Sequence, residues 1–138
     1  MIHSINPFLN FNGNAADALA LYQSALGANV VEKMTWRDLP NEDVPPEVAD
    51  HIMYARLEIG GGAVELSDVP PGMSVSPGSN CHVAIHSTDP KELDKMFAAL
   101  MEGGEVEMPL ENMFWGARYG KLRDRFGISW TFNCPLDS

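Results

Sequence analysis

Hydrophobic side chains recur at helical spacing in two segments of the chain. The first segment begins at Asn14 and carries apolar positions at Ala18, Leu21, Tyr22, Ala25 and Leu26. The second begins near Asp89-Pro90 and carries them at Leu93, Met96, Phe97, Leu100 and Met101. Both sets follow the i, i+3, i+4, i+7, i+8 pattern of a helix with one apolar face. Each position in the second set lies 75 residues after its counterpart in the first, which indicates an internal repeat.

Alternating and β-branched hydrophobic runs predict four strands in each half of the chain. In the first half they cover residues 5–11, 30–36, 52–59 and 63–68; in the second, residues 81–87, 105–110, 117–123 and 129–133. Each helix lies between the first and second strands of its half, so the order is βαβββ twice. We therefore predict one α+β domain over residues 1–138. Its modules, 1–69 and 79–134, are joined by a Pro-, Gly- and Ser-rich linker, 70–78.

One face of the predicted strands is apolar and the opposite face carries polar groups, because successive residues of a strand point to opposite sides. The polar face contains Asn6, Glu65, His82, His86 and Thr131. If the sheet curves, this face becomes a cup. Mostly apolar walls with a few convergent polar groups are typical of small-molecule sites, so we expect a ligand there.

Charge and composition narrow the range of partners. The chain has 138 residues, with 9 Lys+Arg against 19 Asp+Glu and a net charge of −10. Such a surface repels phosphate polyanions, which argues against nucleic acid and acidic membranes and favours cationic ligands. There is no apolar run near the ~20 residues that span a bilayer. The first residues also lack the features of a signal peptide, so we predict a cytoplasmic protein.

Several motifs together resemble the vicinal oxygen chelate (glyoxalase/bleomycin resistance/dioxygenase) superfamily, and its PhnB-like branch most. They are Asn6-Pro7-Phe8-Leu9-Asn10-Phe11-Asn12-Gly13-Asn14, Tyr22 with Leu26-Gly27-Ala28, Leu66-Ser67-Asp68, Met108-Pro109-Leu110, Phe114-Trp115-Gly116-Ala117-Arg118-Tyr119-Gly120, and Arg123-Asp124-Arg125-Phe126-Gly127-Ile128-Ser129-Trp130. The resemblance implies two βαβββ modules that form a curved mixed sheet around a cleft, and a homodimer. The sequence leaves open whether two chains exchange modules.

The resemblance also implies four metal-ligand positions, one each on the first, fourth, fifth and eighth strands. In this chain they are Asn6, Glu65, His82 and Thr131. Glu65 and His82 are good ligands for a divalent Zn, Ni, Mn or Fe ion, whereas Asn6 and Thr131 are weak ones. The alternatives are that Glu65 and His82 form a hydrogen-bonded structural pair without metal, or that they act as a metal-free acid and base.

Trp115, Arg118 and Tyr119 form an aromatic and basic cluster in the second half. Arg118 is either a bidentate partner for an anionic ligand or the partner of a surface acid. The candidate ligand-binding residues are thus Asn6, His86, Trp115, Arg118 and Thr131, and Glu65 and His82 are the candidate metal ligands.

Three functions remain open from the sequence. The first is binding of a small molecule in the cup with a divalent metal, and the second is metal-free sequestration of a ligand, as in bleomycin-resistance proteins. The third is association with a partner through the acidic loop 37–50, which has five acids and three prolines. If the protein is an enzyme, the resemblance implies metal-dependent lyase, isomerase, transferase or oxygenase chemistry. A methyltransferase is not supported, because no glycine-rich strand-to-helix turn is present.

Overall fold

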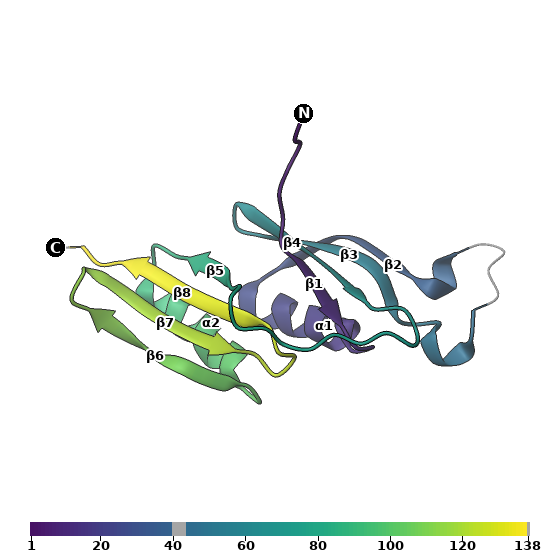
Figure 1. Cartoon of the computed structure of the whole chain (residues 1–138). Coiled ribbons are helices and arrows are strands. Elements are labelled where there is room, and N and C mark those ends of the chain that lie inside the picture. Colours follow the sequence, from purple (N-terminus) through teal and green to yellow (C-terminus); the bar gives the residue numbers. More distant parts are fainter. Residues whose placement is uncertain (40–43, 138) are drawn as a thin grey trace. The chain divides into compact units, whose positions relative to one another are not determined.

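The chain folds into two compact units, Met1–Val75 and Ser76–Ser138. The computed structural model describes residues 1–39 and 44–137. Each unit is a four-stranded sheet with one helix (Figure 1). The linker is shared between the units: the Asn12 side chain makes two hydrogen bonds of 2.9 Å with the Val75 backbone. Arg123 Nη2 donates to the Gly78 carbonyl at 2.7 Å. The linker is thus tied to the first unit through Val75 and to the second at Gly78.

The first unit contains β1 (Phe8–Phe11), α1 (Ala15–Leu26), β2 (Asn29–Thr35), β3 (Ile52–Ile59) and β4 (Gly62–Asp68). Its sheet has the order β1-β4-β3-β2. The β1–β4 pair is parallel and the other two pairs are antiparallel. Helix α1 packs on β3 and β4, and the buried core of this unit includes Tyr22, Leu57 and Leu66.

The second unit repeats this order with β5 (Val83–His86), α2 (Pro90–Met101), β6 (Glu105–Met113), β7 (Ala117–Arg123) and β8 (Ser129–Pro135). Its sheet order is β5-β8-β7-β6, with a parallel β5–β8 pair. Helix α2 packs on β6, β7 and β8. The buried Trp130 and Phe132 fill the core, where the Phe97 and Phe132 rings meet edge to face at 5.1 Å. The predicted α+β fold with βαβββ order in each half is confirmed.

The first strand of each unit starts later than predicted. Strand β1 begins at Phe8 instead of residue 5, and β5 begins at Val83 instead of residue 81. Ile5, within the predicted first strand, lies outside β1 and is 84% exposed. Pro7 has no N–H to extend the ladder, although its carbonyl still accepts a hydrogen bond from the Glu65 N–H at 2.9 Å. As a result, neither Asn6 nor His82 lies within a strand.

The buried residues of the two helices differ in part from the predicted apolar faces. In α2, the predicted residues Leu93, Met96, Phe97 and Leu100 are buried, but Met101 is 42% exposed. In α1, the buried residues are Ala15, Ala18, Leu19 and Tyr22, whereas the predicted Leu21, Ala25 and Leu26 are only half-buried. The buried stripe of α1 lies closer to its first turn because that turn is the part anchored to the sheet.

Part of the predicted acidic loop 37–50 is ordered into local structure. Two short 3₁₀ helices, Trp36–Asp38 and Pro46–Val48, lie in it, and Arg37 Nε pairs with Asp50 at 2.9 Å. Residues 40–43 of the loop lie outside the described residues. Across the described part of the chain, no helix combines the length and apolar character needed to cross a membrane.

One buried carboxylate organises each unit. In the first, Asp68 is 4% exposed and accepts hydrogen bonds from the Ala15 and Ile52 N–H groups, both at 2.9 Å. In the second, Asp124 is 3% exposed and accepts from the Phe126 and Ile128 N–H groups and from the Trp130 indole. Asp68 therefore joins the first turn of α1 to the start of β3.

Replacing Asp68 tests this organising role. In Asp68→Asn, one side-chain oxygen can still accept a hydrogen bond, but the amide NH₂ would face a second N–H donor. We expect the free energy of unfolding to fall by about 2 kcal/mol, measured by urea denaturation. The same change at the exposed Asp137 is the control and should have almost no effect. An unchanged midpoint in Asp68→Asn would contradict the assignment.

Candidate ligand-binding site

The face of the first sheet opposite α1 carries several accessible polar side chains. We call it open face 1. Strand register aligns Phe8, Glu65, Arg56 and Glu32 in one row across its four strands. Their neighbours along the strands, such as Leu9, Leu66 and Leu57, point to the helix side and are buried. Val64 and Leu66, on either side of Glu65 in β4, are buried, and Glu65 lies on the predicted polar face.

A phenol–carboxylate pair is the best-defined polar contact on open face 1. The Tyr54 hydroxyl donates to Glu65 Oε1 at 2.6 Å, and the Tyr54 ring lies 6.2 Å from the Phe8 ring. This hydrogen bond is the main cause that raises the pKa of Tyr54 above its ordinary value. Burial of the phenol and the charges of Glu65 and Glu32 raise the pKa further, while Arg56 opposes the shift. The Tyr54 phenol therefore stays protonated as a donor at neutral pH.

The face of the second sheet opposite α2, called open face 2, carries two aligned rows. One row places His86 beside Asn133 and Asn133 beside Tyr119. Here the His86 Nδ1 and Asn133 Nδ2 atoms are 3.4 Å apart. The other row places Thr131 between Ala84 and Lys121. Lys121 Nζ lies 3.4 Å from Glu107 Oε2, and Arg123 Nε lies 3.8 Å from Glu107 Oε1. The charges of these two cations are therefore already partly neutralised.

Trp115 adds an aromatic wall beside open face 2. It lies in the turn between β6 and β7, is 53% exposed, and meets the Tyr119 ring edge to face at 6.0 Å. The neighbouring Phe114 is 98% exposed, and its ring centroid lies 5.1 Å from that of Trp115. Of the predicted ligand-binding residues, the second unit thus gathers His86, Thr131 and Trp115 around one face.

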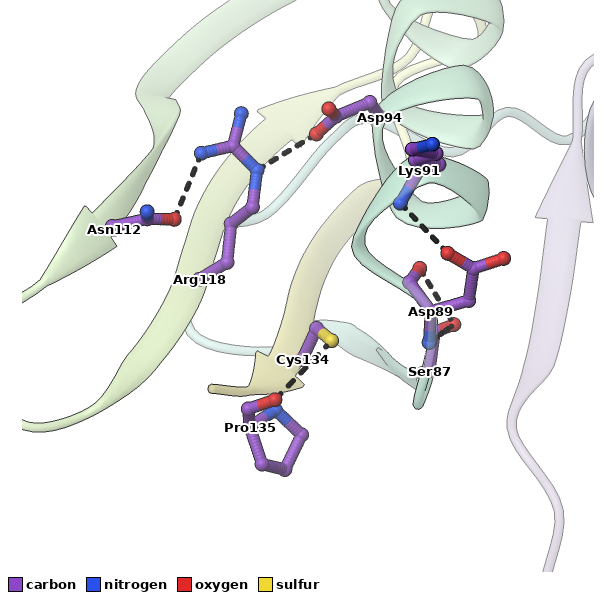
Figure 2. Close-up of polar contacts among 8 residues, drawn as sticks. All are labelled: Ser87, Asp89, Lys91, Asp94, Asn112, Arg118, Cys134 and Pro135. Carbon is purple, nitrogen blue, oxygen red and sulfur yellow. Dashed lines mark hydrogen bonds and ion pairs between the residues drawn. The ribbon is translucent and has the colours of Figure 1, made fainter. Parts of the chain in front are cut away.

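Arg118 does not join this group. It is adjacent to Tyr119 on β7, so its side chain points to the opposite, helix-covered side of the sheet. There Arg118 Nε pairs with Asp94 Oδ1 of α2 at 2.7 Å, and Nη1 donates to Asn112 Oδ1 at 3.0 Å (Figure 2). Of the two roles considered from the sequence, this geometry matches the partner of a surface acid.

The four positions expected to bind metal include only two strong ligands, Glu65 and His82, because Asn6 offers an amide oxygen and Thr131 a hydroxyl. Asn6 and Glu65 belong to the first unit, and His82 and Thr131 to the second. In the register, the β1 residue beside Glu65 is Phe8 and the β5 residue beside Thr131 is Ala84, and neither side chain can bind a metal. Asn6 instead donates to Ser4 Oγ at 3.3 Å. Among the described residues, no three His, Cys, Asp or Glu side chains gather as a metal site. These residues do not fit the superfamily's metal centre.

Sequence reasoning missed Tyr54, Arg56 and Asn133 as site residues, and it named Tyr119 only as a member of the aromatic and basic cluster. Part of this result could have been predicted from the sequence. Strand alternation alone places Tyr54 and Arg56 on the same face of β3. Their position beside Glu65 requires the β3–β4 register, which pairs Arg56 with Glu65. That register depends on the hairpin at Gly60–Gly62 and is not readable from the two strands separately.

Comparison with known proteins places the chain in a family. Residues 4–132 match the Glyoxalase/Bleomycin resistance protein/Dioxygenase superfamily. The chain is 31% identical to protein YjdN of Escherichia coli K12 over 94% of this chain and 93% of that protein. It also resembles the crystal structure of protein PA1353 from Pseudomonas aeruginosa, with a TM-score of 0.86 and 36% identity over 99% and 100% of the two chains.

A further solved structure shares the fold at lower identity. It is the PhnB protein from Bacillus cereus, described as a putative 3-demethylubiquinone-9 3-methyltransferase. The TM-score is 0.76 and the identity 23%, over 98% of this chain and 100% of that one. At that identity the match shows the fold alone. The resemblance inferred from the sequence motifs is confirmed at the level of the superfamily, with a PhnB protein among the structural neighbours.

The Tyr54–Glu65 hydrogen bond makes a prediction about ionisation. Because donation to Glu65 is the main cause of the raised Tyr54 pKa, Glu65→Gln should lower the pKa of Tyr54 toward its ordinary value of 10.0. The stabilisation from this bond is present below the ordinary pKa and is lost as pH rises through the folded-state pKa. The measurement is a tyrosine-ring NMR titration, with Tyr54→Phe to assign the signal. Glu58→Gln is the control and should leave the midpoint in place.

Proposed function

The chain belongs to the Glyoxalase/Bleomycin resistance protein/Dioxygenase superfamily, and on that premise we propose that it binds a small organic molecule on the open faces of its sheets. The observation that carries the proposal is the alignment of His86, Asn133 and Tyr119 on the face that α2 leaves uncovered, with Trp115 beside them. The binding we propose needs no metal, as in the sequestration alternative considered from the sequence.

The side chains of open face 2 have complementary tasks in this proposal. The Trp115 indole, half of which is exposed, gives a flat apolar contact surface. Asn133 and Thr131 each have a donor and an acceptor, and the imidazole of His86 adds another of each in its neutral form. A ligand that lies against Trp115 would thus find polar partners along the neighbouring row, and these would fix its orientation.

The charge pattern supports a ligand that is neutral or cationic. Lys121 and Arg123 share Glu107, and Arg118 is engaged with Asp94, so these three cations of the second unit are balanced by acids. The chain as a whole has a net charge of −10. Long-range attraction would therefore steer cations toward the protein and oppose anions. We carry the homodimer and the cytoplasmic location into the proposal as expectations from the sequence.

The proposal predicts that binding depends on open face 2. A library of small organic amines, amides and aromatic compounds, screened by thermal shift, should contain compounds that raise the melting temperature. For such a compound, His86→Ala or Trp115→Ala should weaken the dissociation constant about tenfold, since each removes a direct contact. His3→Ala and Thr88→Val are matched controls outside the face. Loss of binding in the controls, or equal binding in all variants, would contradict this location.

The metal-free character of the proposed binding has its own measurement, directed at Glu65 and His82. Protein purified without chelators is analysed for bound metal per chain, beside Glu65→Ala and His82→Ala. We expect far less than one ion per chain and ligand binding that survives a chelator, because only two strong ligands occupy the family positions. Near-stoichiometric Zn, Ni, Mn or Fe that disappears in both variants would overturn the metal-free proposal.

A further inference from the structure

Glu65 on open face 1 is a half-buried carboxylate without a cationic partner at contact distance. Arg56 is its neighbour in register, yet within residues 1–39 and 44–137 no ion pair of Glu65 lies within 4.0 Å. Glu107 in the second unit differs, since it lies near both Lys121 and Arg123. A partly desolvated carboxylate is stabilised most by a positively charged partner. The position of Glu65 therefore favours a cation that belongs to a bound ligand.

Two aromatic rings flank this carboxylate. Phe8 is the register partner of Glu65 on β1, and Tyr54 reaches it from β3. The two ring centroids are 6.2 Å apart and the ring planes are tilted by 45°. Phe8 is 46% exposed, although it lies within a strand of the sheet. Aromatic faces attract cations through their negative quadrupole, so both rings would reinforce the charge of Glu65.

Tyr54 fixes the direction in which Glu65 can bind. Its hydroxyl occupies Oε1 at 2.6 Å, and in the described part of the chain this is the hydrogen bond that the Glu65 side chain accepts. The second oxygen, Oε2, is left to accept a further donor. The Tyr54 phenol remains protonated at neutral pH, so it holds the carboxylate in place and does not compete for a proton.

We propose that Glu65, Tyr54 and Phe8 form a subsite for an organic ammonium group that is attached to a flat apolar group. The ammonium donates to Glu65 Oε2 and lies against the rings, and the apolar group covers the exposed Phe8. The row Glu65–Arg56–Glu32 contains two carboxylates and one guanidinium, so its remaining charge is negative and disfavours an anion. This subsite rests on the proposed function and adds a class of ligand to it.

The test uses benzylammonium as the probe and benzyl alcohol as its uncharged equivalent. Two-dimensional NMR of the full chain follows amide shifts while each probe is titrated to millimolar concentration. We expect benzylammonium to shift signals around Phe8, Tyr54 and Glu65, and benzyl alcohol to shift them little. Glu65→Gln should weaken binding about tenfold, because it removes a charge-assisted hydrogen bond.

Further variants separate the parts of the subsite. Tyr54→Phe keeps the ring but removes the hydroxyl, so it should weaken binding less than Glu65→Gln does. Phe8→Leu keeps an apolar side chain and should weaken binding about threefold, in line with a lost cation–π contact. Glu58→Gln is the matched control. Like Glu65→Gln it removes one carboxylate charge, but from β3, and it leaves the Phe8 and Tyr54 rings unchanged. The affinity of this variant for benzylammonium should match that of the unaltered chain.

The outcomes are distinct from those for the proposed function. Equal losses in Glu65→Gln and Glu58→Gln would mean a general charge effect and would overturn the subsite, as would equal binding of benzyl alcohol. Binding of Zn²⁺ or Mn²⁺ at Glu65 that displaces benzylammonium would also overturn it in favour of a metal. If benzylammonium fails but other compounds bind at His86 and Trp115, only this inference fails and the proposed function stands.

Discussion

The first unit depends on the hydrogen bonds that Asp68 accepts at the end of β4. Ala15 is the first residue of α1, so its N–H has no intrahelical partner, and Asn14 before it makes no side-chain cap. Asp68 accepts from that group and from the N–H of Ile52, and so the helix start and the β3 start share one carboxylate. A buried carboxylate is stable only when such donors surround it. The bond therefore helps to hold α1 on one side of the sheet and leaves the other side uncovered.

The second unit reaches the same arrangement through different contacts. Helix α2 has a local cap, because Asp89 accepts a hydrogen bond from the Lys91 N–H at 3.0 Å. Its buried carboxylate, Asp124, is instead used in the turn before β8, where it holds two backbone N–H groups and the Trp130 indole. Two modules with one βαβββ order thus use one buried carboxylate each, at different places. In both cases the helix covers one face, and the open face is where ligand chemistry can occur.

The chemistry of each site depends more on the face of the sheet where a residue lies than on which residues are present. Arg118 and Tyr119 are adjacent, yet Arg118 pairs with Asp94 of α2 while Tyr119 aligns with Asn133 on the open side. The register has a comparable effect at Glu65. Within the first unit its neighbours are Phe8 on β1 and Tyr54 on β3, so the position that the superfamily resemblance assigns to a metal ligand lies here beside a phenol donor and an aromatic ring.

The sequence by itself determined the number and order of elements, most of the apolar stripe of α2 and the polar face that contains Glu65, His86 and Thr131. It could do so because helical and strand periodicities are local properties of the chain. It placed the start of β1 three residues too early and that of β5 two residues too early, and so moved Asn6 and His82 into strands. Tertiary structure decided these starts, the anchoring of α1 by Asp68 and the Tyr54–Glu65 pair. These features depend on register and on contacts between segments distant in the chain, such as Asp68 with Ala15, and such partners become neighbours only when the sheet has formed.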